Sequence, residues 1–189
     1  MIYNLKMISR LLSFFLLMIF SPLFFIIALM IILDDGFPII FTQKRIGLNN
    51  TYFNILKFRT MKKDTPDIPT HLVKNNKSHY TRIGPIIRKI SIDELPQLIN
   101  ILKGDMVFIG PRPALYNQYD LIKLRKKARV HKLVPGITGW AQVNGRDELS
   151  IPDKVKMDQY YLNNQSVWLD IKIVFLTSLN VIKSEGVST

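Results

Sequence analysis

The adjacent carboxylates Asp93 and Glu94 are the residues of this sequence best suited to chemistry. Three basic side chains precede them at short range, namely Arg82, Arg88 and Lys89. An ionised aspartate held by a helix N-terminus and nearby arginines can attack phosphorus or bind Mg²⁺. A structural interpretation is also open, because Ser91 and Glu94 have the spacing of a capping box at a helix start. The two interpretations are compatible.

Further basic residues stand in three short segments that could contact phosphate. Residues 57–60 read Lys-Phe-Arg-Thr, residues 110–113 read Gly-Pro-Arg-Pro, and residues 145–147 read Gly-Arg-Asp. The prolines beside Arg112 restrict its backbone, and a guanidinium can bind two phosphate oxygens at once. Each segment taken alone is equally typical of solvated surface charge. Phosphate recognition and surface charge therefore both stay open at this point.

The composition narrows the possible partners. The chain has 189 residues with 26 Lys and Arg against 14 Asp and Glu, a net charge of +12. Such a charge favours phosphates, nucleic acid or an acidic membrane surface. The absence of cysteine excludes disulfides, thiolate metal sites and a cysteine nucleophile. The three histidines show no metal-ligand spacing, so no zinc site is expected.

Residues 11–33 form an uncharged run of 23 residues, 20 of them apolar. As a helix it would extend roughly 35 Å, enough to cross a bilayer core. The run is too long for the apolar region of a signal peptide, and the acidic pair Asp34-Asp35 follows it. Residues 1–35 are therefore predicted to form a membrane segment, and residues 36–189 a catalytic domain with helices at the membrane interface.

Ser21 and Pro22 interrupt this run near its middle. Proline removes one helical hydrogen bond, and a nearby serine hydroxyl can satisfy the carbonyl that is released. Basic residues flank both ends of the run, so the distribution of positive charge mildly favours both ends on the cytoplasmic side. From the run alone, a kinked spanning helix and a helix that returns to the same face are both possible.

The rest of the chain predicts an α+β fold that is mostly helical. Apolar stretches at 37–41 and 52–56 around a polar turn predict a β-hairpin, and residues 106–109 a short strand. Residues 62–77 and 134–146 are predicted to be loops. Predicted helices cover residues 92–102, closed by Gly104, as well as 119–131, 152–162 and 167–182; Pro96 favours a later start for the first.

The helix predicted at 119–131 is basic and amphipathic, because Lys and Arg alternate there with apolar residues. This pattern suits an anionic lipid surface, with nucleic acid as the competing partner and a solvated helix as the plainer alternative. The membrane segment in the same chain favours lipid. The last predicted helix, 167–182, is either buried or interfacial.

Four motifs occur together in an order typical of one family. They are Lys-Phe-Arg-Thr-Met at 57–61, Ser-Ile-Asp-Glu-Leu-Pro-Gln-Leu at 91–98, the segment 104–113 ending in Gly-Pro-Arg-Pro, and the glycine-rich segment 134–146. With the Ser-Pro pair in the apolar run, the chain resembles the small monotopic polyprenyl-phosphate phosphoglycosyl transferases, also called the bacterial sugar transferase family.

The resemblance implies an activity. Such enzymes move a sugar 1-phosphate from a UDP-sugar to polyprenyl (undecaprenyl) phosphate and release UMP, as the first membrane step of O-antigen, capsule or glycoprotein assembly. Carried onto this sequence, Asp93 is the nucleophile that forms a covalent phospho-sugar intermediate and also contacts Mg²⁺, with Glu94 beside it. The phosphates or the nucleotide would be held by five basic residues: Lys57, Arg59, Arg88, Arg112 and Arg146.

The resemblance also implies a location. The Ser21-Pro22 break makes the apolar helix re-entrant, so the protein is monotopic in the bacterial inner membrane with its catalytic domain cytoplasmic and no nucleic-acid partner. Two rival hypotheses remain. In one, Asp93 only binds the metal and the reaction has no covalent step. In the other, the chain is a membrane-tethered basic module that binds anionic lipid or nucleic acid without catalysis.

Overall fold

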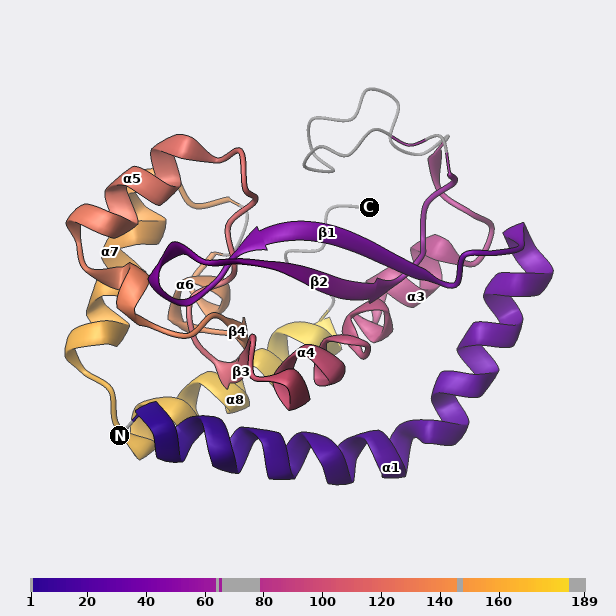
Figure 1. Ribbon diagram of the computed structural model, residues 1–189, viewed down its shortest axis with the longest axis horizontal. Coiled ribbons are helices and arrows are strands. Elements are labelled where there is room, and N and C mark those ends of the chain that lie inside the picture. The colour runs from indigo at the N-terminus through magenta and orange to yellow at the C-terminus, as the bar shows by residue number, and fades with distance from the viewer. Residues whose placement is uncertain (1, 64, 66–78, 146–147, 184–189) are drawn as a thin grey trace.

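The computed structural model of the protein describes residues 2–63, 65, 79–145 and 148–183, and its fold is mostly helical α+β, as predicted (Figure 1). The helices are α1 (Ile2–Asp35), α3 (Gly84–Lys89), α4 (Gln97–Lys103), α5 (Tyr119–Lys127), α6 (Trp140–Val143), α7 (Ile151–Asn163) and α8 (Val167–Lys183). The strands are β1 (Ile40–Ile46), β2 (Tyr52–Phe58), β3 (Val107–Ile109) and β4 (Gly136–Thr138). Short 3₁₀ turns are η1 (Leu48–Asn50), η3 (Ile92–Glu94) and η4 (Val130–Lys132).

Two small sheets provide the framework. β1 and β2 pair antiparallel from Ile40 opposite Phe58 to Ile46 opposite Tyr52, which confirms the hairpin, although its first strand begins later than the predicted 37–41. β3 and β4 pair in parallel through residues 107 and 136. The segment 134–146 was predicted to be only a loop, but it contains β4 and α6. The glycines of this segment are typical of a loop, but glycine also occurs in a short strand where another backbone approaches closely.

Helix α1 is long, and it turns sharply past its midpoint (Figure 1). Pro22 lies inside it and has no N–H to donate to the carbonyl of Met18, four residues earlier. The Ser21 hydroxyl donates to that carbonyl instead, at 2.8 Å. The Ser-Pro pair therefore bends the helix while leaving no carbonyl unsatisfied at residue 18, as the sequence predicts.

Both ends of α1 are fixed to the rest of the molecule. Near its start, the Ser13 hydroxyl donates to the Leu98 carbonyl of α4 at 2.6 Å. At its end, the Asp34 carboxylate accepts from the Ile83 backbone N–H at 3.0 Å, immediately before α3. Between these points Ile27 and Ile31 are buried in one cluster with Phe58 and Ile87. Helix α1 is thus packed onto the elements that carry the candidate site.

The outward faces of α1 and α8 are apolar and exposed. Residues 6–35 are long and apolar enough to cross a membrane, by length and composition. Trp168 of α8 is 81% exposed, and further apolar side chains of that helix are also exposed: Val167, Ile171, Val174, Phe175, Leu179 and Val181. Exposed apolar surface of this extent is typical of a membrane or protein contact. Of the two alternatives for residues 167–182, an exposed face therefore fits the interfacial one.

The remaining helix predictions were correct in type but not always in length. The helix predicted at 92–102 is divided by Pro96 into η3 and α4, and Gly104 ends α4 with a φ of 90°. The helix predicted at 119–131 stops at Lys127, because Arg129 has a φ of 61° and a separate turn, η4, follows. Helices α7 and α8 agree with prediction. Most of the loop predicted at 62–77 lies outside the described residues.

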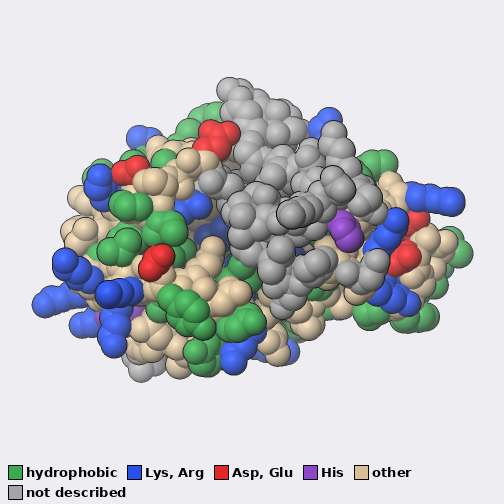
Figure 2. Space-filling view, turned by 90° about the horizontal axis from the view of Figure 1, so that it is seen from above, with side chains coloured by type: hydrophobic (Ala, Val, Ile, Leu, Met, Phe, Trp, Pro, Cys, Tyr) green, Lys and Arg blue, Asp and Glu red, His purple; other side chains and the backbone are tan. Residues whose placement is uncertain are grey.

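Helix α5 does not have the apolar outer face that a lipid-binding helix requires. Leu121 is buried with Ala114 and Val155, and Ile122 and Leu124 of α5 pack against this cluster. Figure 1 shows α5 at the upper left of the molecule, across the body from α1. Lys and Arg side chains gather at that end in the space-filling view (Figure 2). These observations favour the solvated-helix alternative for its basic face.

Candidate active site

Asp93 and Glu94 lie in the η3 turn, directly before α4. The capping-box interpretation is wrong, because Ser91 has a left-handed φ of 57° and its side chain makes no capping hydrogen bond. The Glu94 carboxylate turns to basic residues instead. Its Oε1 atom accepts from Lys57 Nζ at 2.7 Å and from Arg112 Nη2 at 3.2 Å. Both carboxylates of the acidic pair therefore contact basic side chains, and neither caps a helix.

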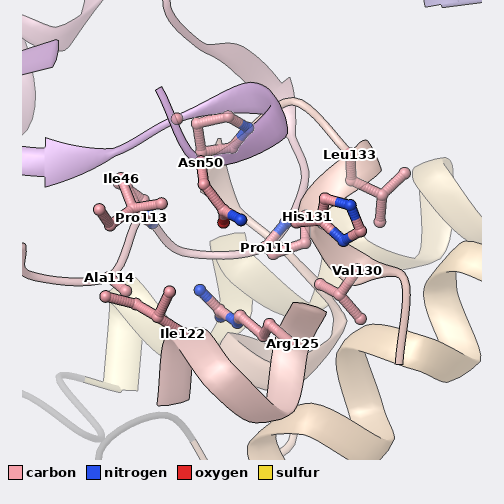
Figure 3. A pocket seen from close by; sticks show the side chains of 12 residues that line it. Ile46, Asn50, Pro111, Pro113, Ala114, Ile122, Arg125, Val130, His131 and Leu133 are labelled. Atoms are coloured by element: carbon pink, nitrogen blue, oxygen red, sulfur yellow. The ribbon is translucent and has the colours of Figure 1, made fainter. Parts of the chain in front are cut away.

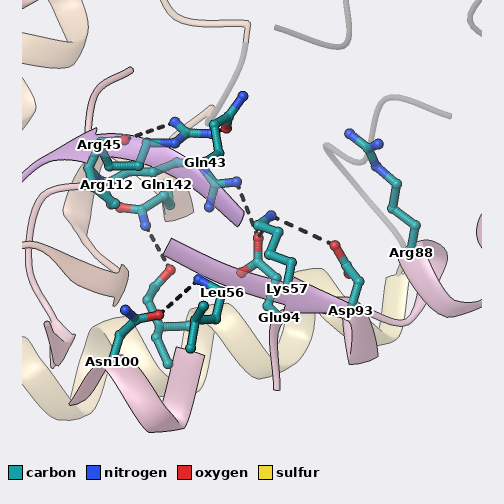
Figure 4. Close-up of polar contacts among 12 residues, drawn as sticks. Gln43, Arg45, Leu56, Lys57, Arg88, Asp93, Glu94, Asn100, Arg112 and Gln142 are labelled. Atoms are coloured by element: carbon teal, nitrogen blue, oxygen red, sulfur yellow. Dashed lines mark hydrogen bonds and ion pairs between the residues drawn. The ribbon is translucent and has the colours of Figure 1, made fainter. Parts of the chain in front are cut away.

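This cluster brings together residues that are distant in the sequence (Figure 4). Lys57 comes from β2, the carboxylates from η3, and Arg112 from the segment after β3. Lys57 Nζ lies 3.7 Å from Asp93 Oδ2, so a single ammonium group is shared by both carboxylates. Arg88 of α3 extends on the opposite side of Asp93 from Arg112 in this view. The predicted site residues Lys57, Arg88, Glu94 and Arg112 thus all act electrostatically on a fifth, Asp93.

Asp93 is 5% exposed, and this burial governs its charge. Burial raises the pKa of the Asp93 carboxyl above its ordinary value, because removal from water disfavours the charged form. Lys57 is the strongest opposing influence on this pKa; the Glu94 charge raises it further, and Arg88 and Arg112 lower it. The three cations therefore determine how much of the buried carboxyl is available as an anion.

The loop that carries Arg112 is held through its carbonyl groups. The backbone nitrogens of Gly136 and Ile46 donate to the carbonyls of Pro111 and Ala114, at 3.0 and 2.9 Å. The Arg45 guanidinium donates to the Pro113 carbonyl at 3.0 Å. Gly136 must be glycine, since an added Cβ would lie 2.1 Å from the Gly110 nitrogen. The rigidity expected from the prolines is thus reinforced by hydrogen bonds that the sequence pattern does not reveal.

Arg59 lies apart from this cluster, although the sequence grouped it with the phosphate-binding residues. Its side chain is 5% exposed and forms an ion pair with Asp35 at 2.8 Å. It also donates to the backbone carbonyls of Asp35 and Gly36, at 3.0 and 2.6 Å. The structure therefore gives Arg59 the role of fastening the end of α1 to the end of β2. Arg146 falls outside the described residues.

A small cavity lies beside the Arg112 loop and is lined by Pro111 and Pro113 (Figure 3). Its lining includes Asn50, Arg125 and His131, and its volume is about 30 Å³. A space of this size holds a water molecule and is far too small for a nucleotide sugar. The candidate site is therefore the charged cluster around Asp93, not this cavity.

The residues at the cluster are compatible with Mg²⁺ shared with a substrate. Within the described part of the chain there is no group of three or more His, Cys, Asp or Glu side chains that could hold a metal alone. Magnesium is commonly bound by one or two carboxylates together with substrate phosphates. Asp93 is suited to this, because Glu94 Oε1 is already occupied by two cations.

Sequence reasoning missed several residues that support the site. Arg45 and Gln43 of β1 are hydrogen-bonded to each other beside Arg112 (Figure 4). Arg125 belongs to the helix predicted from the sequence to be basic and amphipathic. Its side chain, however, pairs with Asp158 of α7 and donates to the Arg112 carbonyl. These partners are up to 33 residues apart. No local spacing signals the pairing of Arg125 with Asp158, since it is created by the packing of α5 on α7.

Comparison with known proteins establishes the family. Residues 3–184 match the family described as bacterial sugar transferase. The chain therefore belongs to the bacterial sugar transferase family, which confirms the resemblance inferred from the motifs. It is accordingly a transferase.

Three relatives illustrate the similarity. An uncharacterized sugar transferase of Bacillus subtilis, EpsL, is 46% identical over 155 residues, which are 82% of this chain and 75% of that protein. An undecaprenyl-phosphate glucose phosphotransferase of Komagataeibacter xylinus is 44% identical over 176 residues, 87% of this chain and 33% of the relative. A UDP-N-acetylgalactosamine-undecaprenyl-phosphate N-acetylgalactosaminephosphotransferase of Aeromonas hydrophila is 39% identical over 174 residues, which are 89% of this chain and 41% of the relative. The matches thus span less than half of the two relatives with a named substrate.

The position of Arg59 leads to a test of its role. Arg59→Met should lower the free energy of unfolding by about 3 kcal/mol, because it leaves Asp35 and two backbone carbonyls without their partner. Thermal and denaturant unfolding of the detergent-solubilised protein would measure this. Lys156→Met, which removes an exposed ion pair with Asp153, is the control and should cost less than about 1 kcal/mol. Unchanged stability with weaker substrate binding would instead support the phosphate-binding role.

The raised pKa of Asp93 leads to a second test. Between the ordinary and the raised pKa the folded protein binds more protons than the unfolded chain, so stability falls as pH rises through this range. The charged carboxylate therefore costs stability at neutral pH. In buffer with EDTA, Asp93→Asn should raise the melting temperature at about pH 7.5 by about 2–4 °C and leave it unchanged below about pH 3.5.

The exposed Asp120→Asn serves as the matched control for this experiment. It should leave the melting temperature nearly unchanged at both pH values. A melting temperature of Asp93→Asn equal to or below that of wild type at about pH 7.5 would show that Lys57 and the arginines outweigh burial, contrary to the direction of the pKa shift.

Proposed function

We propose that the protein transfers a sugar 1-phosphate from a UDP-sugar to polyprenyl (undecaprenyl) phosphate and releases UMP. The observation that carries this proposal is a buried aspartate, Asp93, surrounded by Lys57, Arg88 and Arg112. Such an arrangement suits attack on a phosphorus atom, because the cations attract the anionic substrate and offset the charge that develops on it. The names of the relatives from Komagataeibacter and Aeromonas support the substrate classes.

The proposed reaction has two steps. In the first, an Asp93 carboxylate oxygen attacks the phosphorus nearest the sugar, and the bond to the oxygen that bridges the two phosphorus atoms breaks, so that UMP leaves. In the second, an oxygen of polyprenyl phosphate attacks the same phosphorus, and the bond to Asp93 breaks. The carboxylate is thereby restored, and the product is a polyprenyl-diphosphate sugar, the starting unit of a glycan.

The neighbouring residues have distinct tasks in this scheme. The Lys57 ammonium lies 3.7 Å from Asp93 Oδ2 and lowers the pKa of this carboxyl, against the effect of burial, which favours the charged form needed for attack. Glu94 holds the Lys57 and Arg112 side chains in place through Oε1, so we assign it a positioning role. Mg²⁺, bound by Asp93 and the substrate diphosphate, would supply charge neutralisation when present.

Arg88 and Arg112 would serve the two phosphate substrates from opposite sides. Arg88 belongs to α3, whose Ile86 side chain is exposed, and Ile90 directly after this helix is exposed as well. This apolar surface is a suitable neighbour for a lipid, so Arg88 would contact polyprenyl phosphate. Arg112 lies beside the polar residues Gln43 and Arg45 of β1 (Figure 4), so it would contact the nucleotide diphosphate.

The contacts of α1 support a monotopic arrangement on the cytoplasmic leaflet of the bacterial inner membrane. A straight spanning helix separates its ends by the bilayer, yet Ser13 and Asp34 both contact the same catalytic body. The bend at Ser21 and Pro22 allows the helix to enter the membrane and return. The exposed apolar faces of α1 and α8 would lie in the lipid, where the acceptor phosphate is found.

Trapping of the covalent intermediate tests the nucleophile. With a UDP-sugar that carries ³²P next to the sugar, and without polyprenyl phosphate, wild-type protein should retain label through denaturation. Asp93→Asn should retain none, because an amide cannot form the acyl phosphate. Label should leave the wild-type protein when polyprenyl phosphate is added.

Two outcomes would contradict this proposal in different ways. Steady turnover by wild-type protein that never retains label would favour a direct transfer in which Asp93 only binds the metal. No reaction with any of a broad set of UDP-sugars would favour a membrane-tethered basic module instead. Asp120→Asn, on the surface of α5, should behave as wild type in both assays.

The absence of cysteine makes the topology directly testable. A single cysteine placed before residue 1, or Thr51→Cys at the exposed hairpin turn, should be protected from a membrane-impermeant maleimide in intact cells. Both should react after permeabilisation, because both ends of α1 are expected on the cytoplasmic side. Labelling of the N-terminal cysteine in intact cells, with Thr51→Cys still protected, would show that α1 spans the membrane.

A further inference from the structure

Arg125 and Asp158 form an almost fully enclosed ion pair behind the active-site loop. The Asp158 side chain is 1% exposed and that of Arg125 is 12% exposed. Arg125 Nε and Nη2 both donate to Asp158 Oδ2, at 2.9 and 2.6 Å. Its remaining terminal nitrogen, Nη1, donates to the Arg112 carbonyl at 2.8 Å. One guanidinium thus connects α7 to the residue that contacts Glu94.

A buried ion pair of this kind needs a reason beyond stability. Removing two charges from water costs about as much as their attraction returns, so apolar replacements of such pairs are often at least as stable. A carboxylate that binds two nitrogens of a guanidinium does, however, fix the plane of that group. The direction of the third donor is then also fixed, and here it points to the Arg112 backbone.

The loop around Arg112 needs such external support. Pro111 and Pro113 have no N–H, so they cannot donate to a neighbouring strand. The loop is held through its carbonyls instead, with Gly136 N on Pro111, Arg45 Nη1 on Pro113 and Ile46 N on Ala114. The Arg125 bond acts on residue 112 itself, directly at the base of the side chain that reaches Glu94.

We propose that Arg125, oriented by Asp158, is a positioning residue that holds Arg112 in the geometry needed to contact Glu94 and the diphosphate of the substrate. The kinetic part of this inference rests on the proposed function. Arg125 does not itself touch the charged cluster in the described contacts, and it acts through the Arg112 backbone. Lysine cannot replace it, because an ammonium group lacks the planar fork that binds Asp158 and the carbonyl together.

A double-mutant cycle tests this inference. Arg125→Lys and Asp158→Asn should each lower kcat/KM for UMP release about tenfold in an otherwise wild-type protein, mainly through KM for the UDP-sugar. In an Arg112→Ala background, the same changes should have less than about a twofold effect, because the side chain being positioned is gone. An equal loss in both backgrounds would overturn the proposal.

Tyr161→Phe is the matched control. It removes a partly buried hydrogen bond, 2.8 Å long, from Tyr161 of α7 to Asp170 of α8, without touching the Arg112 loop. It should lower the melting temperature, but less than Asp158→Asn, which leaves the Arg125 guanidinium without its counter-charge. Any loss of kcat/KM that it causes should be the same with and without Arg112→Ala. This comparison separates positioning of Arg112 from general loss of stability.

Amide hydrogen exchange tests the positioning without requiring turnover. The backbone N–H groups of Gly136 and Ile46 donate to carbonyls of the Arg112 loop. Both should exchange at least about fivefold faster in Arg125→Lys than in wild type, and at the wild-type rate in Tyr161→Phe. Unchanged exchange in Arg125→Lys would overturn the proposal. Faster exchange in a protein that releases no UMP would uphold the positioning and contradict the proposed function instead.

Discussion

The structure depends on keeping a negative charge on a carboxylate that is removed from water. Burial raises the pKa of Asp93 and so favours the protonated carboxyl, which is a poor nucleophile and a poor metal ligand. Lys57, Arg88 and Arg112 oppose this effect from three different segments of the chain. The fold can therefore be understood as the means of bringing these cations to one carboxylate, with Glu94 holding two of them at a fixed separation.

The long apolar helix α1 is held to the same site by hydrogen bonds. Ser13 binds α4, which follows the carboxylates, and Asp34 binds the residue before α3, which carries Arg88. Arg59 joins the end of α1 to the end of β2, two residues after Lys57. The position of the candidate site relative to the apolar face of α1 is thus fixed by direct hydrogen bonds. This arrangement suits a reaction between a cytosolic nucleotide sugar and a phosphate at the lipid surface.

Features set by local sequence were predictable, and features set by tertiary packing were not. The hairpin, the bend at Pro22 and helices α7 and α8 follow from turn residues, proline chemistry and apolar periodicity. The roles of Glu94 and Arg59 did not follow, because their partners come from other elements. Capping-box spacing even suggested the wrong partner for Glu94. The acidic pair Asp93-Glu94 was selected from its basic neighbours, and the choice of Asp93 as nucleophile came from the family resemblance, whereas the burial that raises the pKa of Asp93 could not be predicted.

The identity of the released nucleotide tests the account most directly. Attack by Asp93 on the phosphorus nearest the sugar breaks the bond from this phosphorus to the bridging oxygen of the diphosphate, so UMP leaves. Transfer of the sugar alone would instead break the bond between the sugar and its phosphate oxygen, so UDP would leave. Purified protein with Mg²⁺, polyprenyl phosphate and a panel of UDP-sugars should release UMP in amounts equal to the lipid product, and Asp93→Asn should release none. Release of UDP, or UMP release that persists in Asp93→Asn, would contradict the account.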